Sequence, residues 1–573
     1  MAEAPAKQGG GAAAQRGEAE RSACLPADRR RAAREQGGGA AAQRAAGERS
    51  SKGWLAGYVA ATFLAFPHPV GGQVVDLGLL CAWLSPLCLL RALEGLAPAR
   101  AARRGFLAGL LAHAAIFHWI YVVTVRYGHA PPPVGVVAPV GLAAYVAAFT
   151  AGFAGANAWL GARGLASPFA IAALWTCFDH LRSFVLTGFP WATLGYAQHA
   201  SPALLGLAPY TGVYGLSFVT ALGAAGLDAA WRDRRAAGRP GRAALAALGA
   251  VAALHAAGLA SHLTAREDGA GSVRVAVLQG NIDQGVKWSR EWFEATLAAY
   301  VELTREAAAA GAELVVWPET AVPAAIETGE REIDLLSDLA RETRVALVVG
   351  AVGIEPSAPG GLPRVYDSAF VVTPAGAVED RYDKTQLVPF GEYVPFQELL
   401  GFLRAVARGI AATGVTAGEA PRAVEVPLPG PGGRRLSAGV PICYELLFPD
   451  LVRRFVRDGA ELLLAITNDA WYGRTGAPYQ FLAITALRSA ETGLWTARAA
   501  NTGVSAIIDG RGRVRSETRI FERAWLVADV PVRPASDGGT FYVRHGDWLA
   551  GVCWVAVLVQ AVRGIAGTRR IHG

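Results

Sequence analysis

One cysteine is the candidate nucleophile in the second half of this chain. Between His262 and His545 the sequence has no histidine, and between Cys177 and Cys553 its only cysteine is Cys443. Within that stretch, a Ser-His-Asp site, a Cys-His site and the usual His-containing zinc sites are therefore excluded. Nucleophilic chemistry there would have to combine the Cys443 thiol with a carboxylate and an amine.

Three short motifs supply those groups at the ends of predicted strands. WPET (317–320) places Glu319 after a buried strand, RYDK (381–384) ends in Lys384, and PICYE (441–445) holds Cys443 between a strand and a predicted helix. A thiol at a helix N-terminus would have its thiolate favoured by the helix dipole. Lys384 is also unusual because the chain has only four lysines against 50 arginines. The pKa of a lysine ammonium group shifts readily with its surroundings, whereas a guanidinium stays charged.

Each of these residues also has an ordinary structural interpretation. Cys443 could be a core residue, Glu319 a turn or cap residue, and Lys384 a solvated surface charge. The occurrence of all three motifs at strand ends favours a catalytic site over three separate coincidences.

The composition indicates that part of the chain lies in lipid. Of its 573 residues 52% are hydrophobic and 18% charged, with a mean hydropathy of +0.28. Helices of roughly 20 apolar residues cross a bilayer. Eight runs approach that length, although Pro67 and Pro69 shorten the first: they lie near 53–67, 75–94, 105–125, 134–160, 168–187, 208–231, 243–261 and 548–566.

Arginine-rich loops predict the orientation of these spans. They follow the second, sixth and eighth runs, and all three lie on one side if every run spans. The positive-inside rule makes that side cytoplasmic. We therefore expect a multi-pass protein of a bacterial inner membrane with its segment 263–547 in the periplasm. This bias accounts for the net charge of +7, and no nucleic-acid partner is predicted.

The predicted domains follow from these runs. Residues 1–52 form a low-complexity tail, in which QGGGAAAQR occurs at 8–16 and again at 36–44, and we predict it to be disordered. Spans one to seven occupy 53–262, a catalytic domain 263–547, the last span 548–566, and a cytoplasmic tail 567–573.

The exported segment alternates strands and helices, which is typical of a layered α/β sandwich. A TPAG turn at 373–376 joins 368–372 to 378–382 as a hairpin. The other predicted strands are 273–279, 313–317, 345–351, 436–442, 462–466 and 504–509, and the predicted helices are 291–310, 330–344, 449–458 and 479–493.

In this order and context, Glu319, Lys384 and Cys443 resemble the Glu-Lys-Cys triad of the nitrilase (carbon-nitrogen hydrolase) superfamily. The α-β-β-α sandwich of that superfamily agrees with the pattern of elements. The resemblance covers about 273–530 and extends to QGNI (279–282), TNDAWYG (467–473) and NTGVS (501–505).

The membrane part narrows the resemblance. Eight spans with a nitrilase-like domain between the last two resemble the apolipoprotein N-acyltransferase family, and FPW (189–191), LGY (194–196) and GLAP (206–209) are similar to its membrane-half signature. The family more often has Glu and then Trp where this chain has Asp179 and His180. The resemblance implies transfer of an acyl chain from a phospholipid to the α-amino group of a lipoprotein's diacylglyceryl-cysteine, through a thioester.

The resemblance also implies roles for the triad and its neighbours. Glu319 would be the general base and acid, and Lys384 would stabilise the oxyanion together with backbone N–H groups near Tyr444. Glu392 and Glu445 match acidic positions that would orient Lys384 and Cys443.

Aromatic residues are the predicted substrate contacts. Trp288, Tyr393 and Trp471 are expected to line the substrate pocket, although Trp288 could equally be a packing residue. The segment 395–410 has a helix-like apolar spacing and is interpreted as a lid that touches lipid, with a plain core helix as the alternative.

The implied partners are a phospholipid acyl donor, a diacylglyceryl apolipoprotein acceptor and membrane lipid. The sequence has no metal or nucleotide motif, so we predict an enzyme without cofactor or metal. We also expect the enzyme to be a monomer. Two alternatives remain at this level: a membrane-anchored amidase that hydrolyses a small amide through the same triad, and an inactive scaffold that keeps the fold.

Overall fold

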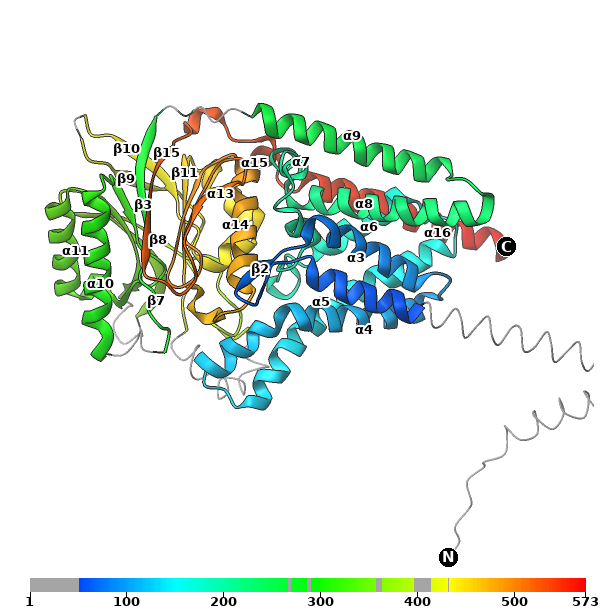
Figure 1. The fold of residues 1–573 in the computed structure, drawn as a ribbon, viewed down its shortest axis with the longest axis horizontal. Helices are drawn as coiled ribbons and strands as arrows, with labels where there is room; N and C mark the ends of the chain where they lie inside the picture. The colour runs from blue at the N-terminus through cyan, green and yellow to red at the C-terminus, as the bar shows by residue number, and fades with distance from the viewer. Residues whose placement is uncertain are drawn as a thin grey trace, which may run out of the picture.

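Helices and sheets occupy opposite ends of the molecule (Figure 1). The computed structural model describes residues 51–265, 269, 271–285, 290–356, 363–395, 414–430 and 432–572. The predicted tail before residue 51 lies outside this part of the chain. A helical bundle forms one end and a sandwich of two sheets the other, so the two expected halves are distinct bodies joined at one face.

Each of the eight predicted apolar runs coincides with a helix. Residues 51–64 form the first, and the others are α3 (Gly78–Leu93), α4 (Pro98–Ile116), α5 (Pro132–Gly161), α6 (Pro168–Leu181), α8 (Ala208–Ala237), α9 (Arg242–Thr264) and α16 (Trp548–His572). Among the described residues, α5, α8, α9 and residues Trp548–Gly567 of α16 are long and apolar enough to cross a membrane on their own. The number eight therefore stays a prediction.

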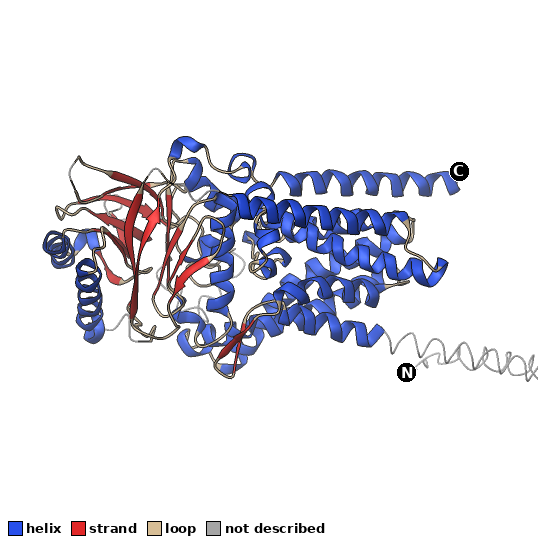
Figure 2. Ribbon diagram, turned by 45° about the horizontal axis from the view of Figure 1, so that its top comes forward, coloured by secondary structure: helices blue, strands red, loops and turns tan. Residues whose placement is uncertain are grey.

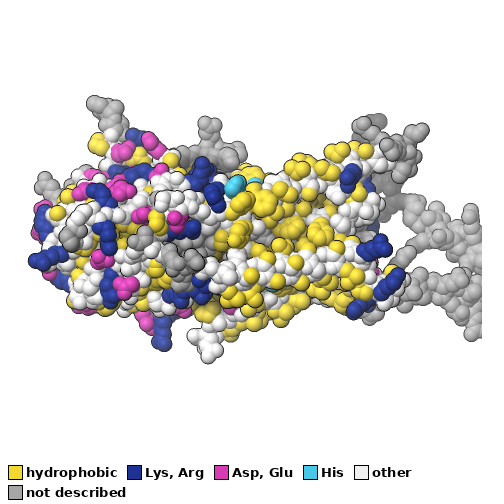
Figure 3. Space-filling view, turned by 90° about the horizontal axis from the view of Figure 1, so that it is seen from above, with side chains coloured by type: hydrophobic (Ala, Val, Ile, Leu, Met, Phe, Trp, Pro, Cys, Tyr) yellow, Lys and Arg dark blue, Asp and Glu magenta, His cyan; other side chains and the backbone are white. Residues whose placement is uncertain are grey.

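The outer surface of the bundle is apolar (Figure 3). Figure 3 shows a broad hydrophobic belt over the helices, with Lys and Arg side chains gathered at its two ends. Large apolar side chains that would be costly to expose to water lie on this surface, among them Leu107, Leu111, Val136, Val137, Val555 and Val562. Such a contiguous surface is the expected outside of a protein that is solvated by lipid.

Short elements fill the end of the bundle that meets the sandwich. They are the hairpin β1 (His68–Val70) and β2 (Gln73–Val75), the π-helix η2 (Val122–Tyr127), the 3₁₀ helices η1 (Phe117–Trp119), η3 (Val185–Thr187) and η4 (Leu194–Gln198), and the short helix α7 (Pro202–Leu205). Because this end is built from short helices and a hairpin, it presents backbone groups as well as side chains to the sandwich.

The predicted α-β-β-α sandwich is confirmed (Figure 2). One sheet has the order β15-β3-β4-β6-β7-β8, with β5 paired to β6, and the other has the order β14-β13-β12-β11-β10-β9. The strands of the first are β3 (Ser272–Gln279), β4 (Leu314–Val316), β5 (Val322–Ala325), β6 (Ala346–Glu355), β7 (Arg364–Val372), β8 (Val378–Asp383) and β15 (Ala524–Pro531). Those of the second are β9 (Val424–Pro427), β10 (Arg435–Gly439), β11 (Leu462–Thr467), β12 (Thr496–Ala500), β13 (Ala506–Ile508) and β14 (Val514–Glu517).

Helices cover the outer face of each sheet (Figure 1). Those on the first sheet are α10 (Arg290–Ala309) and α11 (Glu330–Thr343), and those on the second are α13 (Pro449–Arg457) and α14 (Ala477–Thr492). In β3, Val275 and Val277 belong to the core between the sheets, while Ala276 and Leu278 belong to the core under α10 and α11. Both faces of the strand are buried over residues 275–278, which explains the apolar run there.

Helix α14 joins the two halves. It packs against α8, and all of its residues except Tyr479 are buried. Gln480 accepts a hydrogen bond from Trp191 Nε1 at 2.8 Å, and Glu491 accepts one from the backbone N–H of Val213 at 2.7 Å. The inner layer of the sandwich is therefore also a layer of the bundle.

Candidate active site

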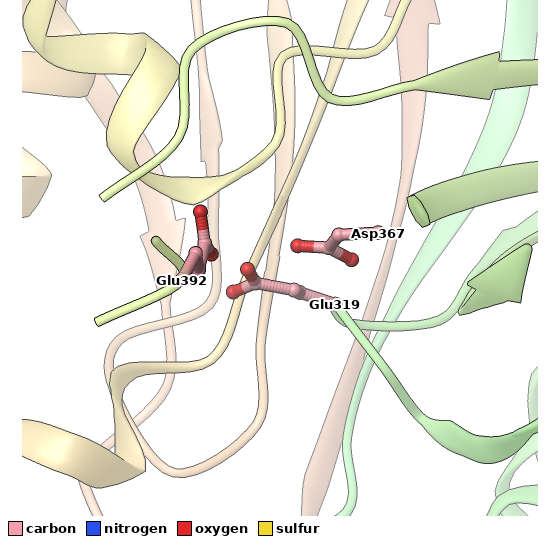
Figure 4. A group of neighbouring side chains, drawn as sticks. All are labelled: Glu319, Asp367 and Glu392. Atoms are coloured by element: carbon pink, nitrogen blue, oxygen red, sulfur yellow. The ribbon is translucent and has the colours of Figure 1, made fainter. Parts of the chain in front are cut away.

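Lys384 lies at the centre of the polar cluster, directly after β8. Its Nζ donates to Glu319 Oε1 at 2.9 Å, to Asp367 Oδ2 at 3.1 Å and to Glu392 Oε1 at 2.5 Å, and the side chain is fully buried. Figure 4 shows the three carboxylates converging from separate segments. An ammonium group has three N–H donors, so all three of them are engaged.

The charges of this cluster are closely coupled. Burial lowers the pKa of Lys384, but Glu319, Glu392 and Asp367 outweigh that effect and hold the pKa well above its ordinary value. Burial raises the pKa of both Asp367 and Glu392, and Glu319 raises them further. The three carboxylates could together surround a metal ion, but in this structure the ammonium of Lys384 lies among them.

Asp367 is a member of the cluster that sequence reasoning missed. It is a buried carboxylate in β7, whose neighbours Tyr366 and Ala369 are also buried. Its backbone carbonyl accepts from the backbone N–H of Lys384 at 2.9 Å, because β7 and β8 pair as the predicted hairpin. A carboxylate within a mostly apolar strand, opposite the lysine in a hairpin, is the signal that could have identified Asp367.

Glu319 follows β4 and connects the lysine to the second sheet. Its Oε2 accepts from the backbone N–H of Asn468 at 2.7 Å, and Asn468 Nδ2 in turn donates to Gln284 Oε1 at 2.7 Å. Gly350 allows the close approach, since a Cβ there would lie 2.7 Å from the Glu319 Cα. The Glu319 carboxylate is thus held from two sides, and its supports are Asn468 of the motif 467–473 and, through Asn468, Gln284 just after the motif 279–282.

Cys443 begins a short turn, η7 (Cys443–Leu447), in a conformation that is uncommon for a residue with a side chain. Its φ is +46° and its thiol is buried. Burial raises the pKa of Cys443 well above its ordinary value, Glu319 raises it further, and Lys384 opposes both. Positive φ for a non-glycine residue stores strain of the kind found at functional sites.

The expectation that a helix dipole favours the Cys443 thiolate stays a prediction, because Cys443 begins only the short 3₁₀ helix η7. The helix predicted there, α13, begins only at Pro449, and the five-residue turn that precedes it does not prevent burial from raising the pKa of the thiol. An adjacent base would offset this effect of burial on Cys443.

Glu445 and Tyr444 hold the turn. Glu445 accepts from Tyr382 OH at 2.6 Å, from the backbone N–H of Thr385 at 2.7 Å and from the backbone N–H of Ile442 at 2.8 Å. The last bond fixes the backbone next to Cys443. Tyr444 OH donates to the backbone carbonyl of Gly188, in the membrane half, at 2.9 Å.

The predicted substrate contacts are dispersed. Tyr393 is half-buried next to Glu392, and Trp471 is half-buried with its ring centroid 6.0 Å from that of Tyr127 in η2. Trp288 and residues 396–410 of the predicted lid lie outside the described residues.

Known proteins match both halves of the chain. The model of the carbon-nitrogen hydrolase family matches residues 274–535, and that of the apolipoprotein N-acyltransferase N-terminal domain matches residues 60–226. A curated apolipoprotein N-acyltransferase of Geobacter metallireducens is 38% identical over 88% of this chain and 93% of its own length. One of Azotobacter vinelandii is 38% identical over 82% and 89%. A solved amidase from Nesterenkonia is 22% identical over 47% of this chain and 93% of that chain, with a TM-score of 0.34.

Proposed function

The chain belongs to the apolipoprotein N-acyltransferase family, and on that premise we propose that Cys443, Glu319 and Lys384 carry out its acyl transfer. The protein is a membrane acyltransferase of lipoprotein maturation, with a phospholipid donor and a lipoprotein acceptor. The observation that carries the proposed roles is the buried hydrogen bond of 2.9 Å between Lys384 Nζ and Glu319 Oε1. The charges of both residues act on the pKa of the Cys443 thiol.

In the first half-reaction Cys443 attacks the ester carbonyl of the phospholipid. Glu319 takes the thiol proton as the S–C bond forms, and it returns the proton to the oxygen of the departing lysophospholipid as the C–O bond breaks. Because burial keeps the pKa of Cys443 high, no standing thiolate is available at neutral pH. The proton must move at the moment of attack, and the acyl chain remains on Cys443 as a thioester.

Lys384 stabilises the tetrahedral oxyanion, and for this one of its three bonds has to open. Glu392 is the carboxylate that yields: its side chain is 18% exposed, compared with 8% for both Glu319 and Asp367. An oxyanion that replaces one carboxylate keeps the ammonium's hydrogen bonds complete, with backbone N–H groups near Tyr444 as further donors.

In the second half-reaction the α-amino group of the lipoprotein attacks the thioester. Glu319 accepts the amine proton while the N–C bond forms, and Cys443 leaves with the proton returned to its sulfur. Water has to be kept from the thioester, which distinguishes this enzyme from an amidase with the same triad. Trp471, Tyr393 and Trp288 are proposed to line the pocket for the two lipid substrates.

The proposed orientation puts the sandwich in the periplasm of a bacterial inner membrane. It is supported by the arginines in the first turns of α4, at the end of α8 and in its connection to α9, and in the last part of α16, which belong to the end of the bundle away from the sheets (Figures 1 and 3). On this proposal eight helices span the bilayer, the catalytic domain is 263–547, and the enzyme acts as a monomer.

Acyl loading without an acceptor tests the proposed function. Purified protein in phospholipid vesicles with a labelled acyl chain should gain one labelled acyl group on Cys443, which neutral hydroxylamine removes because it cleaves thioesters and spares amides. Lysophospholipid should stop accumulating at one equivalent of enzyme. Cys443→Ala should carry no label, and Cys443→Ser should load poorly because its alcohol is a weaker nucleophile. Continuous release of lysophospholipid would instead identify a hydrolase.

A further inference from the structure

A loop of the membrane half reaches into the catalytic domain. Residues 182–198, here called the junction loop, connect the end of α6 to α7 and include η3 and η4. The loop follows the segment 175–182, where this chain departs from its family in having Asp179 and His180. The triad chemistry assigns no task to these residues.

The junction loop is hydrogen bonded to both ends of the nucleophile turn. Near the first end, Tyr444 OH donates to the backbone carbonyl of Gly188 at 2.9 Å. At the other end, Tyr196 OH donates to the backbone carbonyl of Leu447 at 3.1 Å. The residues in the second pair are 251 positions apart in the sequence. The turn that carries the strained Cys443 is thus held between two points of the membrane half.

Gly188 fits this position because it has no side chain. Its φ is +82°, and a Cβ would lie 2.1 Å from the backbone oxygen of Ser183 and 3.1 Å from a ring carbon of Phe448. The carbonyl that accepts from Tyr444 can therefore approach the turn only from a glycine.

The bundle fixes the junction loop from the opposite side. Arg182 Nη2 lies 3.3 Å from Asp179 Oδ1 and donates to Thr193 Oγ1 at 3.0 Å, while the backbone N–H of Leu194 donates to Asp179 Oδ2 at 3.3 Å. Asp179 and Arg182 are both buried. Buried charges in a membrane bundle are costly, so they mark a function. Here they tie the two ends of the loop together.

Tyr196 is itself held in place. It is 2% exposed, and Arg488 Nη2 of α14 donates to its hydroxyl oxygen at 3.3 Å. The hydroxyl therefore accepts from the sandwich and donates to the nucleophile turn, which fixes its direction.

We propose that the junction loop is part of the acyl-transfer machinery, and that Tyr196 is a positioning residue which acts through Leu447 to hold the Cys443 turn in its reactive geometry. This inference rests on the proposed function, because it assigns the turn its nucleophile. It also gives the Asp179–Arg182 pair a task, which is to keep the loop in the shape that presents Tyr196 and the Gly188 carbonyl.

The test is Tyr196→Phe in the full-length protein, which removes one hydroxyl and leaves the ring. Single-turnover acylation of Cys443 from labelled phospholipid should fall roughly ten-fold, the effect of one lost buried hydrogen bond on the reactive geometry. The lipid concentration for half-maximal rate should not change. Tyr210→Phe is the control, since Tyr210 is a membrane-half tyrosine whose side chain is 49% exposed, and it should load at the wild-type rate.

Alkylation of Cys443 by iodoacetamide provides a second readout that needs no lipid. A displaced turn changes the position of the thiol relative to Glu319 and Lys384, so the pH profile of alkylation should shift in Tyr196→Phe and not in Tyr210→Phe. Tyr444→Phe, which frees the other attachment, should shift it in the same way.

Normal loading and an unshifted profile in Tyr196→Phe would overturn the inference and leave the proposed function intact. A variant that only melts at a lower temperature, with both readouts unchanged, would overturn it equally. Wild-type protein that never carries label would refute the proposed function, and the alkylation profiles would still decide whether Tyr196 positions Cys443.

Discussion

At the scale of single residues, the Cys443 environment opposes ionisation of the thiol that it is proposed to use. Burial and Glu319 both raise the pKa of Cys443, and only Lys384 among the named neighbours lowers it. A resting thiolate would be open to adventitious oxidation and alkylation. A thiol that loses its proton only when Glu319 accepts it is protected between turnovers.

Glu319→Gln is therefore expected to separate thiol reactivity from catalysis. Removing the negative charge lowers the pKa of Cys443, so alkylation by iodoacetamide at neutral pH should become faster than in wild type. Acylation from phospholipid should fall by about 10²–10⁴-fold, because the base is lost. Timed mass spectrometry of Cys443 measures both reactions in one preparation. Slower alkylation in the variant would contradict the electrostatic account.

The residues of the site differ in how far the sequence predicts them. The motifs that hold Glu319, Lys384 and Cys443 each follow a strand, and the strand ends bring them to one edge of the sandwich. Asp367 was missed because it lies inside a strand, where periodicity alone assigns it to a face and says nothing of its neighbour across the hairpin. The pKa of Cys443 is raised, whereas the sequence predicted a favoured thiolate, because the thiol is buried. Local sequence does not reveal that burial.

At the scale of elements, α14 stabilises both halves through a buried ion pair. Arg488 Nη1 lies 3.1 Å from Glu491 Oε2, and both side chains are almost wholly inaccessible. Burial raises the pKa of Glu491 from 4.5 to about 7, although Arg488 acts in the opposite direction. The carboxyl group is therefore only partly ionised at neutral pH.

The junction should accordingly weaken as pH rises. The folded protein binds the Glu491 proton more tightly than the unfolded chain, so this contribution to stability is full below pH 4.5 and is lost as pH rises through about 7. In Glu491→Gln this part of the dependence of stability on pH should vanish. Melting temperatures of both proteins across this range measure the effect, and Glu342→Gln on the exposed face of α11 should keep the wild-type slope. Parallel slopes in all three would refute the assignment.

Helices and strands were predicted best where the apolar residues follow a single helical or strand spacing. The strand 273–279 and the helices 291–310 and 330–344 match β3, α10 and α11 to within a residue or two. Strand β12 was missed because its sequence, TARAA, contains Arg498. A charged residue is typical of a solvent-exposed segment, so the pattern did not indicate a buried strand. In the structure Arg498 is fully buried and paired with Asp469 at 2.8 Å.

At the scale of the whole molecule, the distribution of arginine is the feature that sets orientation. Fusion of a reporter after Arg242 should give cytoplasmic activity, and fusion after residue 360 should give periplasmic activity, because the arginine-rich connections stay on the cytoplasmic side. Paired enzyme reporters that work on only one side of the membrane make the measurement. The reverse pattern would contradict the proposed orientation and remove access to lipoproteins.

The sequence predicted a membrane half and a sandwich half, but it did not predict the interface between them. Contacts such as Tyr196 with Leu447 and Glu491 with Val213 link segments that are hundreds of residues apart. Neither partner carries a local pattern that indicates the other. Hydrophobic periodicity identifies which face of α14 is apolar, but it cannot distinguish a face that meets a sheet from one that meets a membrane helix.

The pairing of β3 with β15 has a consequence for biosynthesis. β3 is the first strand of the sandwich to emerge during translation, yet it lies inside its sheet, between β4 and β15. The strand that covers its open edge is the last one made. The nascent sandwich therefore exposes an apolar, pairing-competent edge until translation is nearly complete, and such an edge favours aggregation. A chain that stops before residue 524 would leave that edge uncovered permanently, and it should be found in aggregates or as degradation fragments.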